Sequence, residues 1–222
     1  MSTCIITGAG SGIGKATAIS LASKAFFDKY AIIGRSYESV RETISTMRSH
    51  IDGENIKFYC LDLANSELIP GIVEQIAIEC GDISCLLNIA GYTDPHSLLS
   101  TTLESFELTY RVNVYAPFLF MRECTKYMKS TGGKILNVAP TAGMSPRPGW
   151  LSYSSSKAAV ISMSETLTAE LSEYGIYVYC ISPGRCATKL RTRLAPDEDP
   201  STIMQPEEVA EVICNLISDK ER

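Results

Sequence analysis

Short apolar runs alternate with longer amphipathic segments along the chain. The apolar runs are rich in β-branched residues and nearly continuous, as expected of strands that are covered on both faces of a parallel sheet. They predict six strands, at residues 3–7, 30–34, 56–60, 83–88, 133–138 and 176–182. The amphipathic segments predict helices at about 13–24, 37–50, 66–80, 102–130, 152–174 and 206–218. This alternation predicts a single α/β domain over residues 1–222, built on a doubly wound parallel sheet.

The composition fits a globular protein with a substantial core. Hydrophobic residues make up 45% and charged residues 20% of the 222 residues. The formal net charge of −5 disfavours nucleic-acid binding, because proteins that bind the phosphate backbone usually carry a basic surface. No apolar run reaches the roughly 18–20 residues of a membrane span, and the first residues lead directly into a strand rather than a signal peptide. We therefore expect a cytoplasmic protein without nucleic-acid or membrane partners.

The cysteines do not form a metal-binding pattern. No C-x-x-C pair occurs, and only His50 and His96 are available to complete a metal site. Most of the eight cysteines lie within apolar runs, where a free thiol behaves as a small hydrophobe. We expect buried, reduced thiols and no metal.

A glycine-rich segment follows the first predicted strand and begins the first predicted helix. Residues 7–14 read TGAGSGIG. Glycines in this context allow backbone amides and the helix N-terminus to approach a pyrophosphate. A tight turn without a ligand is the alternative, but the position between strand and helix favours a dinucleotide. The candidate contacts are Gly8, Ser11, Gly12, Ile13 and Gly14.

The end of the second predicted strand bears on which dinucleotide binds. Folds that prefer NAD place an acid there, about 20 residues after the glycine motif, to bind the ribose 2′-hydroxyl. This chain has Gly34, Arg35 and Ser36 instead, so Arg35 can pair with a 2′-phosphate. A solvated loop charge is the alternative for Arg35. The pattern predicts a preference for NADP(H), with NAD(H) as the second choice.

Six motifs together resemble the short-chain dehydrogenase/reductase family, in its order and spacing, from residue 3 to about residue 217. They are Thr7-Gly8 with Gly12-Ile13-Gly14, Asp62-Leu63, Asn88-Ile89-Ala90-Gly91, Asn113, Tyr153 with Lys157, and Pro183-Gly184 with Thr188. The resemblance implies a Rossmann-type fold and an NAD(P)-dependent oxidoreductase. It further implies that Asp62 and Leu63 contact the adenine and that Pro183, Gly184 and Thr188 clasp the cofactor. By the same resemblance Asn88, Ala90 and Gly91 contribute to the cofactor site.

A tyrosine and a lysine form the candidate catalytic pair. Tyr153 and Lys157 lie four residues apart on a predicted helix and therefore share one face. Tyrosine, with its ordinary pKa near 10, transfers protons slowly at neutral pH, and a lysine cation nearby lowers that pKa. For this segment taken alone, the alternative is the start of an ordinary amphipathic helix without a catalytic role. The resemblance adds that Lys157 holds the nicotinamide ribose, and that Asn113 kinks its helix and places a water molecule for a proton relay.

The family's catalytic serine is missing. It normally lies 13 residues before the tyrosine, where this chain has Pro140, which lacks both a hydroxyl and an N–H. Thr141 is the nearest hydroxyl and is predicted to replace it, while Ser145 is a more distant substitute. The rival prediction is a non-catalytic dinucleotide-binding or regulatory protein. The intact Asn113 and Tyr153 favour a working, modified site.

Cations gather in the segments expected beside the substrate. They are Arg185, Lys189, Arg191 and Arg193 after the sixth predicted strand, and Arg147 shortly before Tyr153. In the family the first of these segments lies over the substrate. The cations predict a small polar substrate, for example a phosphorylated or nucleotide-linked carbonyl compound. Solvated charges balanced by the acids at 197–199 are the alternative.

The C-terminal end bears on assembly. Members of the family continue into a seventh strand that often takes part in tetramer contacts, and this chain has no seventh strand pattern. We therefore expect a homodimer, paired through the helices around 104–130 and 152–174, rather than a full tetramer.

Overall fold

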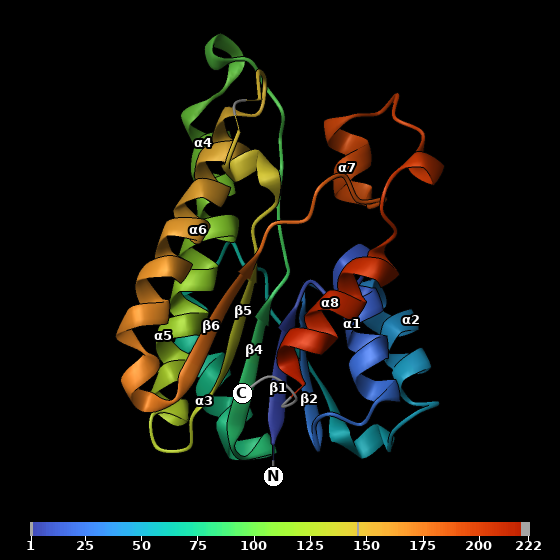
Figure 1. Cartoon of the computed structure of the whole chain (residues 1–222), viewed down its shortest axis with the longest axis vertical. Coiled ribbons are helices and arrows are strands. Elements are labelled where there is room, and N and C mark those ends of the chain that lie inside the picture. Colours follow the sequence, from blue (N-terminus) through green and yellow to red (C-terminus); the bar gives the residue numbers. More distant parts are fainter. Residues whose placement is uncertain (1, 146, 219–222) are drawn as a thin grey trace.

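Six segments of the chain pair as one parallel sheet in a computed structural model that describes residues 2–145 and 147–218. The sheet has the strand order β3-β2-β1-β4-β5-β6 (Figure 1). The strands are β1 (Thr3–Thr7), β2 (Lys29–Gly34), β3 (Ile56–Cys60), β4 (Ile83–Asn88), β5 (Gly133–Val138) and β6 (Ile176–Ile181). All six predicted strands are confirmed to within one residue, and so is the doubly wound parallel fold.

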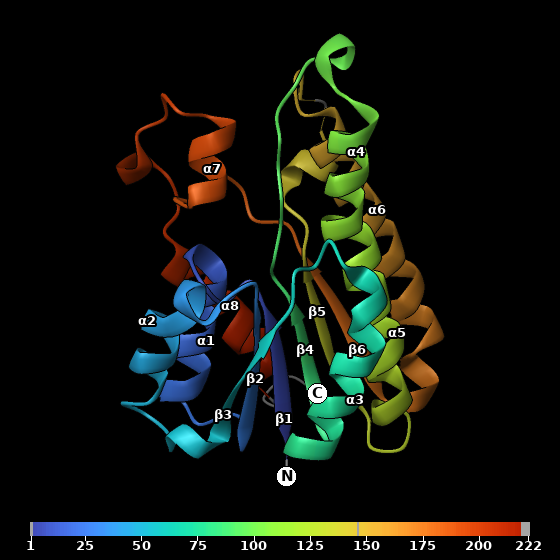
Figure 2. The same cartoon turned by 180° about the vertical axis from the view of Figure 1, so that it is seen from behind.

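Helices cover both faces of this sheet. They are α1 (Gly12–Ser23), α2 (Tyr37–Met47), α3 (Ile69–Cys80), α4 (Leu103–Tyr110), α5 (Ala116–Met128), α6 (Leu151–Glu170), α7 (Lys189–Leu194) and α8 (Pro206–Ile217). One face carries α1, α2 and α8, and the other carries α3, α5 and α6 (Figures 1 and 2). No helix of the described part of the chain is both long enough and apolar enough to cross a membrane.

Two helical predictions need correction. The helix expected over 102–130 is divided, because a π turn at Arg111–Tyr115 separates α4 from α5. The short helix α7 was not predicted, since its six residues, KLRTRL, are too few and too polar to show a periodic apolar face. Both features lie on the site described below.

The continuous apolar character of the central strands follows from two separate cores. Successive side chains of a strand point to opposite faces of the sheet. Ile6 and Leu87 accordingly pack in the core beneath α1 and α8, whereas Ile5 and Leu86 pack in the core beneath α3 and α5. Each strand position therefore faces an apolar layer, and a strand here has no polar side to show in the sequence.

The thiols are mostly part of these cores. All eight cysteines are free, and six of them are buried. Cys60 is exposed and Cys180 is half-buried, which differs from the expectation for the sequence runs around them. Each lies near the end of an outer strand of the sheet, where the covering layer is thinner.

Removing a side chain from the second core should lower stability. Leu86 of β4 is fully buried, and Leu86→Ala should reduce the free energy of unfolding by about 2–5 kcal/mol because it leaves a cavity. Ile78→Ala on α3 is the control, since 79% of Ile78 is exposed and its truncation should change the value by less than about 0.5 kcal/mol. Urea unfolding followed by circular dichroism measures both, and equal effects would contradict the assignment of this core.

Candidate active site

A cavity of about 680 Å³ opens at the carboxyl edge of the sheet. Its walls come from the loops after β1, β2, β3, β4 and β5, from α6, and from the segment that carries α7. The lining includes all but two of the predicted cofactor contacts, namely Gly8, Ser11, Gly12, Ile13, Gly14, Arg35, Asp62, Leu63, Ala90, Gly91, Tyr153, Lys157, Pro183, Gly184 and Thr188. Segments that are far apart in the sequence thus meet in one place.

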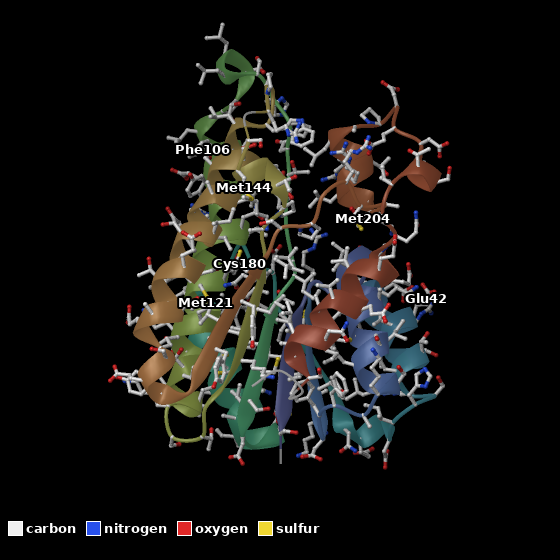
Figure 3. All side chains as sticks on the ribbon, in the orientation of Figure 1. Glu42, Phe106, Met121, Met144, Cys180 and Met204 are labelled. Atoms are coloured by element: carbon white, nitrogen blue, oxygen red, sulfur yellow. The ribbon has the colours of Figure 1, made fainter. Side chains whose placement is uncertain are left out.

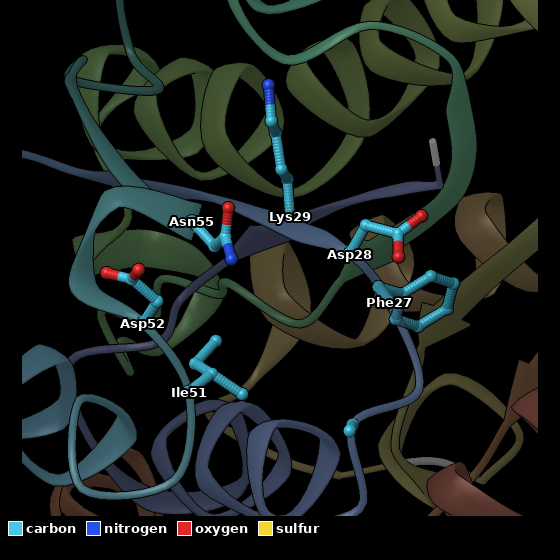
Figure 4. A pocket seen from close by; sticks show the side chains of 7 residues that line it. Phe27, Asp28, Lys29, Ile51, Asp52 and Asn55 are labelled. Carbon is cyan, nitrogen blue, oxygen red and sulfur yellow. The ribbon is translucent and has the colours of Figure 1, made fainter.

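A smaller hollow of about 410 Å³ lies at the opposite edge of the sheet, near the start of β2 (Figure 4). Its polar side chains already have structural roles. Asp28 accepts hydrogen bonds from the backbone N–H and hydroxyl of Ser2, and Asp52 caps a short turn by accepting from the N–H of Glu54. None of the candidate catalytic residues lines this hollow, so the cavity at the carboxyl edge is the candidate site.

Two glycines allow the walls of the cavity to approach one another. Gly8 has a φ of +78°, and a Cβ there would lie 2.6 Å from the backbone nitrogen of Ala90. Gly12 has a φ of +52°, and its Cβ would lie 2.8 Å from Cγ2 of Thr188. Any side chain at either position would push the surrounding loops apart, so these positions require glycine.

The first turn of α1 lines this cavity. Ser11 is the N-cap residue, but its side chain makes no capping hydrogen bond. The first backbone N–H groups of a helix have no intrahelical acceptor, so they are available to an anion in the cavity. The residues present therefore fit the pyrophosphate of a dinucleotide.

The residues at the end of β2 have different positions. Arg35 lines the cavity, is exposed, and forms no ion pair with any residue in the described ranges. Ser36 lies outside the lining, and its hydroxyl caps α2 by accepting from the N–H of Ser39 at 3.3 Å. Asn88 is buried behind the cavity wall and donates to the side chain of Asn137 at 2.9 Å. Direct contact of Ser36 or Asn88 with a cofactor stays a prediction.

The candidate catalytic pair lies on one face of α6, as its spacing predicts. Tyr153 is 2% exposed and Lys157 is 4% exposed, and both line the cavity. The Lys157 ammonium lies 6.0 Å from the centroid of the Tyr153 ring and donates to the backbone carbonyl of Val138 at 3.0 Å. A Cβ on Gly91 would lie 3.6 Å from the same ammonium, so the loop after β4 closes on it from the other side.

The side chain of Asn113 connects this pair to the loop after β4. Asn113 is fully buried in the π turn, and its amide exchanges two hydrogen bonds with the backbone of Tyr92, at 2.8 and 2.9 Å. It also donates to the hydroxyl of Ser156, one residue before Lys157 on α6, at 3.0 Å. The kink expected at Asn113 is present as this π turn, a feature that often marks functional sites.

Comparison with known proteins identifies the family. A family model described as short chain dehydrogenase matches residues 2–199. The chain belongs to the short-chain dehydrogenase family. It is therefore an NAD(P)-dependent oxidoreductase, as the resemblance of its motifs implied.

Two curated members of the short-chain dehydrogenase family match over most of the chain. It is 33% identical over 195 residues to 2,3-dihydro-2,3-dihydroxybenzoate dehydrogenase of Bacillus subtilis, covering 87% of this chain and 73% of the relative. It is 31% identical over 229 residues to 3-oxoacyl-acyl-carrier-protein reductase of Thermotoga maritima, covering 98% of this chain and 90% of the relative.

Solved structures of family members are similar as well. A short chain dehydrogenase of Shigella flexneri, complexed with NADP, matches with a TM-score of 0.90 and 25% identity, over 100% of this chain and 92% of that chain. Another of Escherichia coli, complexed with NADPH, matches with a TM-score of 0.89 and 26% identity, over 98% and 91% of the two chains.

Burial changes the proton affinity of both members of the candidate catalytic pair. It lowers the pKa of Lys157 to about 8, because an ammonium loses hydration in the protein interior. It also raises the pKa of Tyr153 well above its ordinary value, although the nearby cation Arg191 opposes this rise. Tyr153 is therefore protonated at neutral pH, which is the form that can donate a proton to a carbonyl oxygen.

Pro140, where the family resemblance leads one to expect a serine, begins a turn constrained by its ring. Pro140 has a φ of −54° and precedes a short 3₁₀ turn at Thr141–Gly143. The backbone N–H of Thr141 donates to the carbonyl of Pro183 at 3.3 Å, which ties the turn to the loop after β6. Pro140 and Thr141 both line the cavity, and the hydroxyl of Thr141 has no hydrogen-bond partner among the residues placed by the structure. Ser145 is exposed and lies outside the lining.

All of the predicted substrate-side cations line the cavity, but they are not equivalent. Arg185 and Arg191 both pair with Glu198, at 3.2 and 2.5 Å. The alternative that acids at 197–199 balance these charges thus applies to the two arginines. Arg147 and Arg193 form no ion pair within the described ranges.

The sequence motifs do not mark every residue of the site. Tyr92 and Trp150 line the cavity together with Tyr153 and Lys157. Trp150 was recognisable as the one tryptophan of the chain, three residues before Tyr153. The role of Tyr92 depends on its contact with Asn113 on another element, so no local pattern marks it.

Removing the buried lysine should stabilise the fold. Because folding lowers the pKa of Lys157 from 10.5 to about 8, charged Lys157 costs stability below about pH 8, and this cost disappears as the pH rises towards 10.5. The full cost is on the order of 3 kcal/mol. Lys157→Met, which leaves the Val138 carbonyl unpaired, should therefore raise the free energy of unfolding at pH 7 by about 1–3 kcal/mol.

Urea unfolding at pH 7 and pH 10 measures this effect. The gain from Lys157→Met should shrink at the higher pH. Lys24→Met, at an exposed position, is the control and should change stability by less than about 0.5 kcal/mol. A Lys157→Met protein that is less stable at pH 7 would contradict the argument.

Proposed function

We propose that this short-chain dehydrogenase is an NADPH-dependent reductase that converts the carbonyl group of a small polar substrate into an alcohol. The observation that carries the proposal is the buried Tyr153–Lys157 pair in a cavity whose other end presents Arg35. A phosphorylated or nucleotide-linked carbonyl compound fits the cations on the substrate side of the cavity, as their positions in the sequence predict. The crystal structures of similar dehydrogenases with NADP and NADPH support this choice of cofactor.

The chain offers a contact for each part of NADPH. The first turn of α1 and the glycine loop would hold the pyrophosphate, and Arg35 would pair with the 2′-phosphate. Asp62 and Leu63 would flank the adenine, while Pro183 and Thr188 would enclose the nicotinamide end. When bound, NADPH supplies the hydride that reduces the carbonyl carbon.

The proton for the alcohol comes from Tyr153 in this proposal. Its hydroxyl donates to the carbonyl oxygen as negative charge develops there, and the Lys157 ammonium stabilises the tyrosinate that remains. The hydrogen bond from Lys157 to the carbonyl of Val138 holds the ammonium in place. Asn113 keeps the loop after β4 in register with α6. The Thr141 hydroxyl would donate a second hydrogen bond to the carbonyl oxygen.

The rival proposal is a non-catalytic dinucleotide-binding or regulatory protein. Pro140 is the observation that favours it, because the turn has lost the family's serine. The three other members, Asn113, Tyr153 and Lys157, keep a buried and connected arrangement that cofactor binding alone does not need. We therefore favour the catalytic proposal.

A cytoplasmic homodimer completes the proposed function. Exposed aromatic side chains follow one side of α5 and the π turn, at Tyr115 and Phe118, with Arg111 and Arg122 in line with them. Pairing of this stripe with its copy would bury apolar surface that is otherwise exposed. The free thiols are compatible with the reduced cytoplasm.

Arg35 should decide the choice of cofactor. Arg35→Ala should weaken NADPH binding by roughly ten- to a hundredfold, because a charge-assisted contact with phosphate contributes on the order of 1.5–3 kcal/mol. NADH binding should change little, since NADH lacks the 2′-phosphate. Fluorescence titration of both cofactors measures this, with Arg41→Ala on the exposed side of α2 as the control. Equal affinity of the unmodified protein for NADPH and NADH would refute the preference.

Thr141 should be needed for turnover but not for cofactor binding. Thr141→Ala should lower kcat by at most about 10²–10³, the cost of losing one donor to a developing oxyanion. Tyr153→Phe should lower it further, and Thr141→Ser should retain activity because it keeps the hydroxyl. NADPH oxidation in the presence of carbonyl compounds measures kcat, and fluorescence titration should show an unchanged NADPH affinity. Full activity of Thr141→Ala would show that the hydroxyl is not required.

A further inference from the structure

Several cations line the substrate side of the cavity. Asp62, at the cofactor end, is the one acid among the described residues that line the cavity. The segment with α7 contributes Arg185, Lys189, Arg191 and Arg193 to the same lining. An anion at this mouth would therefore gain charge-assisted hydrogen bonds, but only a cation with a defined orientation can select a particular ligand.

Arg191 is the cation of this group with a defined orientation. Its Nε and Nη2 donate to the two carboxylate oxygens of Glu198, at 2.5 and 2.7 Å, so one edge of the guanidinium is fully paired. The guanidinium carbon also lies 5.6 Å from the centroid of the Trp150 ring, on the opposite wall of the cavity. With two such partners, only 20% of the Arg191 side chain is exposed.

Two backbone hydrogen bonds join the start and the end of the segment that carries Arg191. The N–H of Ala187 donates to the carbonyl of Met204 at 2.8 Å, and the N–H of Met204 donates to the carbonyl of Arg185 at 3.1 Å. Figure 3 shows Met204 where this segment returns to the body of the protein. Within the segment, Glu198 pairs with both Arg185 and Arg191 and so connects the start of the segment to α7. Arg191 is thus held in position before any ligand binds.

The other edge of the same guanidinium has no partner among the described residues. Arginine has five N–H donors, and Glu198 accepts from two of them. The remaining edge, Nη1 with the second hydrogen of Nη2, matches a carboxylate or a phosphate in the same planar way. Trp150 bridges this group to the catalytic tyrosine, since the Trp150 and Tyr153 ring centroids are 6.5 Å apart. The Arg191 charge also lowers the pKa of Tyr153, in keeping with their closeness.

We propose that Arg191 binds an anionic group of the carbonyl substrate, a carboxylate or a phosphate, through this unpaired edge. Glu198 is a positioning residue that holds the guanidinium flat against Trp150. The substrate then spans the cavity, with its anionic group at Arg191 and its carbonyl at Tyr153. This inference rests on the proposed function, because it takes Tyr153 as the place where the carbonyl is reduced.

Matched pairs of probes test the proposal on the whole 222-residue chain with NADPH. Acetoacetate and methyl acetoacetate differ by a carboxylate, and dihydroxyacetone phosphate and dihydroxyacetone differ by a phosphate. We expect kcat/KM of the unmodified protein to be at least about tenfold higher for the anionic member of one pair. The pair that shows the difference identifies the anion.

Substitution of Arg191 should remove this preference. Arg191→Met should lower kcat/KM for the anionic probe about ten- to a hundredfold more than it lowers kcat/KM for the neutral probe, and this difference should arise mainly from KM. Arg191→Lys keeps the charge without the planar edge and should fall between. Glu198→Gln should raise KM for the anionic probe while kcat is retained. Arg48→Met, at the C-cap of α2 and outside the cavity, is the control.

Three results would overturn the inference. Equal losses for anionic and neutral probes in Arg191→Met would assign Arg191 a purely structural role. A loss of NADPH affinity in the same variant, measured by fluorescence titration, would show that Arg191 binds the cofactor rather than the substrate. Equal kcat/KM for both members of each pair in the unmodified protein would leave the reductase function intact but remove the anion site.

A binding measurement separates this inference from the proposed function. Calorimetry follows acetoacetate and dihydroxyacetone phosphate binding to the protein saturated with NADP⁺. If no probe is reduced, yet one of them binds and the binding is lost in Arg191→Met, the anion site stands and the reductase function fails. If neither probe binds and neither is reduced, both are wrong.

Discussion

The approach of Gly8 to Ala90 is the contact on which the rest of the site depends. β1 and β4 are neighbours in the sheet, yet the chain leaves them in opposite directions, to α1 on one face and towards α4 on the other. A crevice forms at such a switch point, at the carboxyl ends of the strands. Because Gly8 has no side chain, the two loops can touch at the floor of the crevice. The cofactor loop and the loop against Lys157 are thereby placed on either side of one cavity.

The burial of Lys157 beside Tyr153 lowers the stability of the fold at neutral pH. An ammonium with most of its hydration removed is unfavourable in the protein interior, and the lowered pKa of Lys157 expresses that cost. The surroundings compensate only in part, through the carbonyl of Val138. With a pKa of about 8, Lys157 remains mostly charged at pH 7, beside a tyrosine that keeps its proton. Such an arrangement persists because α6 and the π turn hold it from two sides.

Two features on the substrate side belong together in the proposed function. Pro140 occupies the turn after β5, where it offers no hydroxyl, and the segment with α7 brings the paired and oriented Arg191 to the cavity. In that proposal the anionic end of the substrate sets its orientation, with Thr141 beside the carbonyl.

The sequence alone determined the strands, the parallel sheet and the family, and it placed Tyr153 and Lys157 on one face of a helix. The reason is that these features depend on local patterns: apolar runs that are buried on both faces, a glycine loop between strand and helix, and a tyrosine and a lysine one helical turn apart. It did not reveal which of the cations is oriented, or that Asn113 joins the loop after β4 to α6. Arg191 is oriented by Glu198, beyond the end of α7, and by Trp150 at the start of α6, while Asn113 contacts Tyr92 and Ser156 on two other segments. Only the tertiary structure decided them, because the pairing of side chains between loops depends on where the sheet brings those loops together, and no local periodicity encodes that distance.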